Sequence, residues 1–123
     1  MTQTNSAVIN GVAFTMYPVT DMPRAVAFYA DVLGLKKGDI EAPFWVEFDL
    51  GGSTFGVGNF EQVGAPGSAQ SLAIEVSDMT AYRTGLDAHG VTSSEPYETP
   101  LCFMSSVKDP DGNTIWLHQA KSK

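Results

Sequence analysis

The chain has 123 residues, of which 43% are hydrophobic and 17% charged, and its formal net charge is −7. A chain of this length fits one domain with its own core and leaves no room for a second. The acidic excess would repel phosphate backbones and anionic lipid surfaces, so neither nucleic acid nor a membrane is expected as a partner.

Cysteine content and the N-terminal residues indicate the compartment. Cys102 is the single cysteine, so neither an internal disulfide nor a cysteine-rich metal site can form within one chain. Residues 1–10 form a polar tail without a basic start, and no stretch approaches the roughly 18 apolar residues of a membrane span. We therefore expect a cytoplasmic protein in a reducing environment.

The first half of the chain predicts a strand, an amphipathic helix and further strands. Apolar and β-prone residues indicate the strands, helical spacing of apolar residues indicates the helix, and a Gly-Gly pair indicates the turn of a hairpin. Thr20 or Asp21 suits the helix N-cap, and Gly34 suits the helix end. The expected elements are a strand over 11–19, a helix over 23–33, a short strand near 36–40, and a hairpin of strands 44–50 and 54–59.

The second half repeats this order of elements. Residues 19–22 (VTDM) match residues 76–79 (VSDM), and a segment rich in glycine and proline separates the halves. One unit of this length cannot cover both faces of its sheet, so two units are expected to pair. The expected elements are a strand over 72–77, a helix over 79–89 and a terminal hairpin that turns at 109–113.

We therefore predict an α+β fold in which two βαβββ modules form a cup-shaped mixed sheet with the helices outside. The predicted boundaries, all within one compact domain, are an N-terminal tail over 1–10, a first module over 11–60, a linker over 61–70 and a second module over 71–121.

Two motifs carry a resemblance to a known family. The first runs from Val19 to Gly34 (VTDMPRAVAFYADVLG), and the second is Asp109–Asn113 (DPDGN). Together they resemble the vicinal oxygen chelate superfamily, which includes glyoxalase I, extradiol dioxygenases, fosfomycin-modifying enzymes and bleomycin resistance proteins. The resemblance covers about residues 11–119 and implies the two-module fold and a homodimer. Because one fold hosts many chemistries, it does not imply a particular activity.

In metal-dependent members of that superfamily, His, Gln or Glu side chains from the first and last strands of each module hold a divalent ion. The corresponding positions here are Phe14, Gly56, Ser71 and Trp116. A metal needs three or more nitrogen, oxygen or sulfur donors, and a phenyl ring, an indole and a bare backbone do not supply them. The sequence therefore favours a site without a metal cofactor.

Strand alternation assigns the side chains that line the cup. Their aromatic surfaces and carboxylates suit a planar or cationic organic molecule, and Gly56 is expected to leave room for it. The expected ligand-binding residues are Phe14, Met16, Trp45, Glu47, Gly56, Ser71, Glu75, Met104 (with Phe103 as the alternative wall), Trp116 and His118.

Three of these residues, Glu47, Glu75 and His118, are the candidate catalytic residues. A strand register shifted by one or two residues would bring the same three into consideration for a divalent metal, so a metal remains an open alternative.

The leading hypothesis is a metal-independent binder of a small molecule, similar to bleomycin resistance proteins. The second is a glyoxalase-like lyase, isomerase or epimerase in which Glu47 or Glu75, with a raised pKa in an apolar cup, acts as general base. That mechanism lacks an evident stabiliser for a developing enolate. The third is an interaction module whose cup is filled by its own side chains.

Overall fold

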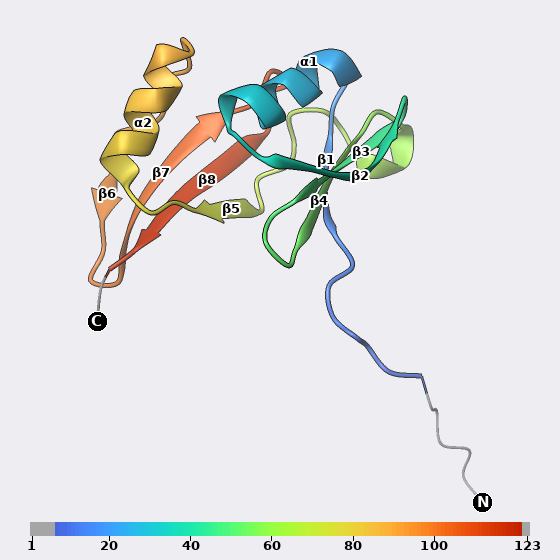
Figure 1. The fold of residues 1–123 in the computed structure, drawn as a ribbon, viewed down its shortest axis with the longest axis horizontal. Coiled ribbons are helices and arrows are strands. Elements are labelled where there is room, and N and C mark those ends of the chain that lie inside the picture. The colour runs from blue at the N-terminus through green and yellow to red at the C-terminus, as the bar shows by residue number, and fades with distance from the viewer. Residues whose placement is uncertain (1–6, 122–123) are drawn as a thin grey trace, which may run out of the picture.

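The computed structural model describes residues 7–121, which form two four-stranded mixed sheets and their helices. Figure 1 shows the two sheets beside each other, with the helices along one side of both and residues 7–14 extending away from the body. This architecture confirms the predicted α+β class with two βαβββ modules, although the strands divide into two separate sheets.

The first module holds strands in the order β1-β4-β3-β2, with β1 parallel to β4. The strand expected over 11–19 is shorter. Its pairing with β4 begins at Thr15 and Phe55, because β4 itself begins at Thr54, directly after the turn over 51–53. The elements are β1 (Thr15–Pro18), α1 (Met22–Val26), the π-helix η1 (Ala27–Val32), β2 (Lys36–Ala42), β3 (Trp45–Asp49) and β4 (Thr54–Gly58).

The helix of the first module begins at a side-chain cap and changes its turn halfway along. Arg24 N donates a hydrogen bond of 3.0 Å to Asp21 Oδ1, so Asp21 is the N-cap. After α1 the turns widen, and Leu33 N donates to Phe28 O, five residues back. The predicted helix is therefore confirmed in position, with a π-helical second half. It ends at Gly34, whose φ of +82° suits glycine.

The second module repeats the topology, with strand order β5-β8-β7-β6 and β5 parallel to β8. Asp78 caps α2, accepting a hydrogen bond of 3.0 Å from Ala81 N. A short 3-10 helix, η2 (Glu61–Val63), lies in the linker before this module. The elements are β5 (Leu72–Glu75), α2 (Met79–Ala88), β6 (Tyr97–Glu98), β7 (Cys102–Lys108) and β8 (Thr114–Ala120).

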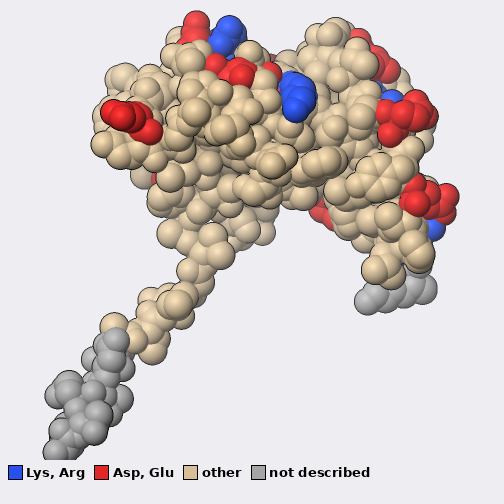
Figure 2. All heavy atoms as spheres, turned by 180° about the vertical axis from the view of Figure 1, so that it is seen from behind, with Lys and Arg blue, Asp and Glu red and all other residues tan. Residues whose placement is uncertain are grey.

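One cluster of buried side chains spans both modules. It joins the helix-facing rows of the two sheets to residues of the helices, such as Phe28, Tyr29 and Leu86. No helix within residues 7–121 is long and apolar enough to cross a membrane. Seen from behind, the charged side chains lie mainly along the upper part and the two ends of the body, and Lys and Arg form no patch on this face (Figure 2).

Tyr17 connects the two sheets at the start of the β5–β8 ladder. Its hydroxyl donates a hydrogen bond of 2.7 Å to Thr114 O and accepts one of 2.7 Å from Leu72 N. Tyr17 is fully buried, and burial is the largest cause of its raised pKa. A side chain of the first sheet therefore completes the main-chain bonding of the second.

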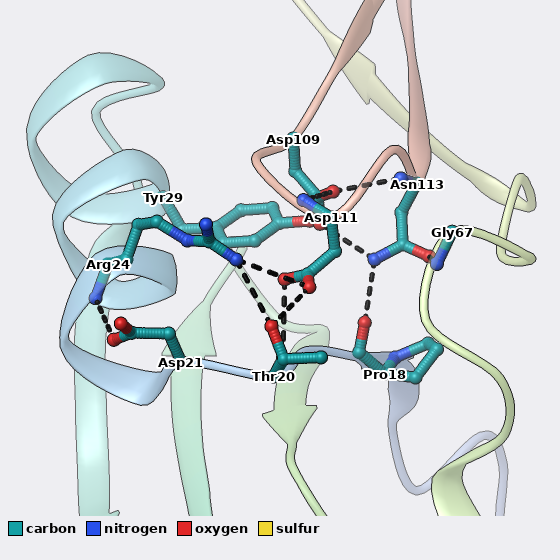
Figure 3. Close-up of polar contacts among 9 residues, drawn as sticks. All are labelled: Pro18, Thr20, Asp21, Arg24, Tyr29, Gly67, Asp109, Asp111 and Asn113. Atoms are coloured by element: carbon teal, nitrogen blue, oxygen red, sulfur yellow. Dashed lines mark hydrogen bonds and ion pairs between the residues drawn. The ribbon is translucent and has the colours of Figure 1, made fainter.

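The DPDGN turn between β7 and β8 also binds the first module. Asn113 Nδ2 donates to Pro18 O at 2.7 Å and to Asp109 Oδ2 at 2.8 Å, while Asn113 Oδ1 accepts from Gly67 N at 2.9 Å (Figure 3). One buried amide thus holds β1, the linker and its own turn together.

Asp111 of the same turn reaches the start of α1. Its Oδ1 accepts a hydrogen bond of 2.6 Å from Thr20 Oγ1 and lies 3.4 Å from Arg24 Nη2 (Figure 3). The motif that the sequence predicted as a tight turn is therefore also the joint between the modules.

Candidate functional site

Each sheet buries one face under its helix and leaves the opposite face open. On β8, Ile115 and Leu117 are fully buried, whereas Trp116 and His118, which alternate with them, are partly exposed. The strand register places the remaining residues. The open face of the first sheet carries Met16, Trp45, Glu47, Gly56 and Gly58; the open face of the second carries Ala73, Glu75, Met104, Trp116 and His118.

Trp45 lies across the backbone of β4 on the open face of the first sheet. A Cβ atom on Gly56 would overlap the indole, at 2.9 Å from Cε2, and one on Gly58 would lie 3.0 Å from Cε3. Nε1 donates a hydrogen bond of 2.9 Å to Glu47 Oε2. The indole is therefore held by the backbone beneath it and the carboxylate beside it. The room that Gly56 provides is taken by Trp45, and the expectation that this room stays free for a ligand is wrong.

This indole belongs to an aromatic patch, defined here as Phe14, Phe44, Trp45 and Phe60, in which Phe14 and Phe60 contact Trp45 and Phe44 contacts Phe60. The Phe14 ring meets Trp45 edge to face at 5.1 Å between centroids, and the Phe60 ring lies 6.2 Å from Trp45. Phe14 is 44% exposed and Phe60 39%. Sequence reasoning missed Phe44 and Phe60. Their positions just before β3 and just after β4, two antiparallel strands, are the signal that could have found them.

The open face of the second sheet has a second indole. Trp116 Nε1 donates a hydrogen bond of 2.9 Å to Gln70 O, which ties the ring toward the start of β5. Met104 lies directly opposite His118 on the neighbouring strand. Phe103 packs against the core instead, so Met104 is the residue of that pair on the open face.

Glu75 and His118 form a hydrogen-bonded pair on the same face. Glu75 Oε1 lies 2.5 Å from His118 Nδ1, and Glu75 Oε2 accepts a hydrogen bond of 2.7 Å from Ala120 N. The backbone bond from Ala120, followed by the bond from His118, lowers the pKa of Glu75. The pKa of Glu75 is thus lowered, and not raised as the general-base hypothesis expected.

The predicted site residues fall into two groups, one on each open face. Phe14, just before β1, joins the residues of the first sheet, and Ser71, just before β5, joins those of the second. The hydrogen bonds and ring contacts described above stay within each group.

A groove of about 790 Å³ runs along the free edge of β5, between the modules. Its walls are residues 71–76 on one side and residues 33–36 with Thr54 on the other, and Tyr82 of α2 reaches across to Leu33 O at 2.6 Å. Burial raises the pKa of Tyr82 to about 12. The sequence pattern of either module alone could not predict this groove, because the groove lies where the two modules meet.

The two βαβββ modules, with their open sheet faces, define a class of fold that hosts varied chemistry. Residues 11–117 match the model of the glyoxalase/bleomycin resistance protein/dioxygenase superfamily, and the chain belongs to that superfamily. Among curated protein sequences, none matches this chain significantly.

Solved structures share the fold over nearly the whole chain. TnmS3, described as an antibiotic binding protein from Streptomyces sp. CB03234, is 27% identical with a TM-score of 0.81, covering 94% of this chain and 99% of its own. A glyoxalase/bleomycin resistance protein from the same strain is 26% identical with a TM-score of 0.78, and the match covers 89% of this chain and 100% of that protein. Lactoylglutathione lyase from Agrobacterium tumefaciens is 20% identical with a TM-score of 0.75, and the match covers 90% of this chain and 94% of that protein. At this identity, the likeness shows the fold alone.

The residues present do not fit the divalent metal of catalytic relatives. Phe14 and Gly56 lie on the open face of the first sheet, and Ser71 and Trp116 on that of the second. One serine hydroxyl is the only side-chain donor suited to a divalent ion among these four. Within the described part of the chain, no three His, Cys, Asp or Glu side chains are grouped so that they could hold a metal ion.

Proposed function

We propose that this protein binds a small organic molecule, at least partly planar, on the aromatic open faces of its sheets and without a metal ion. The observation that carries the proposal is the fixed position of Trp45. Its indole rests on Gly56 and Gly58 and is tied to Glu47, so a flat apolar surface is in place before any ligand arrives. A ligand that meets such a preorganised surface loses less ordering free energy on binding.

The chemistry of both faces suits planar molecules, including planar cations. Each face carries an indole and a carboxylate: Trp45 is bonded to Glu47 on one, and Trp116 shares the other with Glu75. An aromatic face attracts a ring by stacking and a cation through its quadrupole, and a nearby carboxylate adds to the second effect. The description of TnmS3 as an antibiotic binding protein, at 27% identity, supports a ligand of natural-product size.

We also infer that two copies pair as a homodimer. Ligand sites are concave and enclose most of their ligand, whereas each open face is a sheet surface exposed on one side. The aromatic patch and Met16, which is 39% exposed, leave apolar surface that a second copy would cover. Analytical ultracentrifugation should show a dimer at micromolar concentration. A monomer throughout the range would contradict the pairing and leave the ligand proposal standing.

Binding is tested with proflavine and ethidium, two planar cations, by tryptophan emission and calorimetry. We expect saturable quenching, a raised midpoint of thermal unfolding, and loss of most affinity in Trp45→Leu. Thr80→Ala, on the exposed side of α2, is the matched control and should bind as the natural protein does. Absence of saturable binding by both compounds would overturn the proposal for planar cations. Metal-dependent turnover of a hemithioacetal would place the protein with the catalytic members instead.

A further inference from the structure

The Glu75–His118 pair has a feature that the proposed function does not use. Both oxygens of Glu75 are engaged, one with His118 Nδ1 at 2.5 Å and the other with Ala120 N at 2.7 Å. The carboxylate is thus fixed by the backbone of β8, and the imidazole is fixed by the carboxylate. The His118 side chain is one-third exposed, and within residues 7–121 its Nε2 has no hydrogen-bond partner.

The fixed carboxylate determines which ring nitrogen carries the proton. An ionised carboxylate only accepts hydrogen bonds, so the neutral imidazole places its N–H at Nδ1 and leaves a lone pair at Nε2. The low pKa of Glu75 keeps its carboxylate ionised near neutral pH. With the imidazole neutral, the second sheet therefore presents a fixed hydrogen-bond acceptor on its open face.

Two neighbours define what can reach this acceptor. Trp116 lies two residues before His118 on β8, on the same face, and this spacing corresponds to roughly 7 Å along a strand. Met104 stands opposite His118 on β7 and adds an apolar wall. A ring stacked on Trp116 can thus extend a polar substituent to Nε2. The substituent must be a donor, because the nitrogen accepts.

We propose that His118 Nε2 accepts a hydrogen bond from the hydroxyl of a phenol-like or enol-like ligand whose ring stacks on Trp116, with Glu75 as the positioning residue. This inference rests on the proposed function and narrows its ligand class to planar molecules that carry an acidic hydroxyl. Phenols combine a flat apolar body with one strong donor, which matches the combination of indole, methionine and acceptor on this face.

The test compares 2-naphthol with 2-methoxynaphthalene, which share the ring system and differ in the donor. Calorimetric titration of the natural protein should show that 2-naphthol binds about three- to tenfold more tightly, the effect of one hydrogen bond. His118→Asn, whose amide can still bond to Glu75 but offers nothing at the Nε2 position, should bind both compounds equally. His118→Gln, whose amide oxygen can reach that position, should keep part of the preference.

The outcomes separate this inference from the proposed function. Equal binding of the two compounds by the natural protein, or a preference that survives in His118→Asn, would overturn the hydroxyl acceptor and leave planar-ligand binding intact. Binding of neither compound would overturn the hydroxyl acceptor, and the planar-ligand proposal would fall with it only where proflavine and ethidium also fail to bind. Nitrogen NMR of the His118 ring gives a readout without ligand. We expect Nε2 to be the unprotonated nitrogen, and a proton at Nε2 instead of Nδ1 would contradict the inference even where all variants fold normally.

Discussion

Tyr29 and Asp109 lie 80 positions apart in the chain, yet the Tyr29 hydroxyl donates a hydrogen bond of 2.6 Å to Asp109 Oδ2. Burial, followed by the charge of Asp109, raises the pKa of Tyr29 far above its usual range. The bond joins the helix of the first module to the turn of the second (Figure 3). Together with the Asn113 amide, it makes the module joint a network of buried polar groups.

Tyr29→Phe should lower the free energy of unfolding by about 1–3 kcal/mol, because Asp109 Oδ2 loses one of its donors inside the protein. Asn113 Nδ2 still donates to that oxygen, which limits the loss. Urea unfolding measures the change. Tyr97→Phe is the matched control, since Tyr97 is exposed and should change little. Equal effects of the two substitutions would contradict the role assigned to this bond.

Asn113→Ala should destabilise the protein more, by about 3 kcal/mol or above, because one amide serves three segments. Its loss leaves Pro18 O without its side-chain donor and Gly67 N without its acceptor. Asn59→Ala serves for comparison, because the Asn59 side chain makes one exposed bond, of 3.2 Å, to Pro43 O. Denaturant unfolding measures both changes. Equal losses of unfolding free energy in the two variants would contradict the stabilising role of the Asn113 side chain at the module joint.

Much of the fold follows from local patterns. The alternation that separates Ile115 and Leu117 from Trp116 and His118 predicts the open face of β8, because a strand presents its side chains with a period of two. Asp21 as a helix cap and Gly34 as a helix end are likewise local signals.

The interactions across elements could not be predicted in this way. The Glu75–His118 pair depends on the register between β5 and β8, and the two residues are 43 positions apart. The filled space at Gly56 depends on the direction that Trp45 takes across a neighbouring strand. The Tyr17 hydroxyl reaches a sheet to which its own strand does not belong. Each is a property of the assembled fold.

Gly56→Ala should displace the Trp45 indole, because the added methyl group overlaps the ring. We expect a loss of about 1–3 kcal/mol in unfolding free energy, the usual range for overpacking, and weaker binding of proflavine. Gly85→Ala is the control. It lies in α2 with nothing within 4 Å of the added atom, and should instead stabilise the protein by about 0.5–1 kcal/mol. Tryptophan emission and chemical unfolding read both effects. An unchanged emission spectrum in Gly56→Ala would contradict the stacking of Trp45 on β4.

Alkaline pH should destabilise the fold through Tyr82. Burial raises its pKa from 10.0 to about 12, so between these values the unfolded chain loses the phenolic proton while the folded chain keeps it. The unfolded state then binds fewer protons, and the free energy of unfolding falls as the pH rises from about 10 to about 12. Tyr82→Phe removes this proton and also the bond to Leu33 O, so the variant should be less stable at pH 7 but lose less stability over that interval. Unfolding curves at pH 9, 10, 11 and 12 give the free energy of unfolding as a function of pH for both proteins. The same decrease with pH in both would show that Tyr82 does not cause the loss of stability.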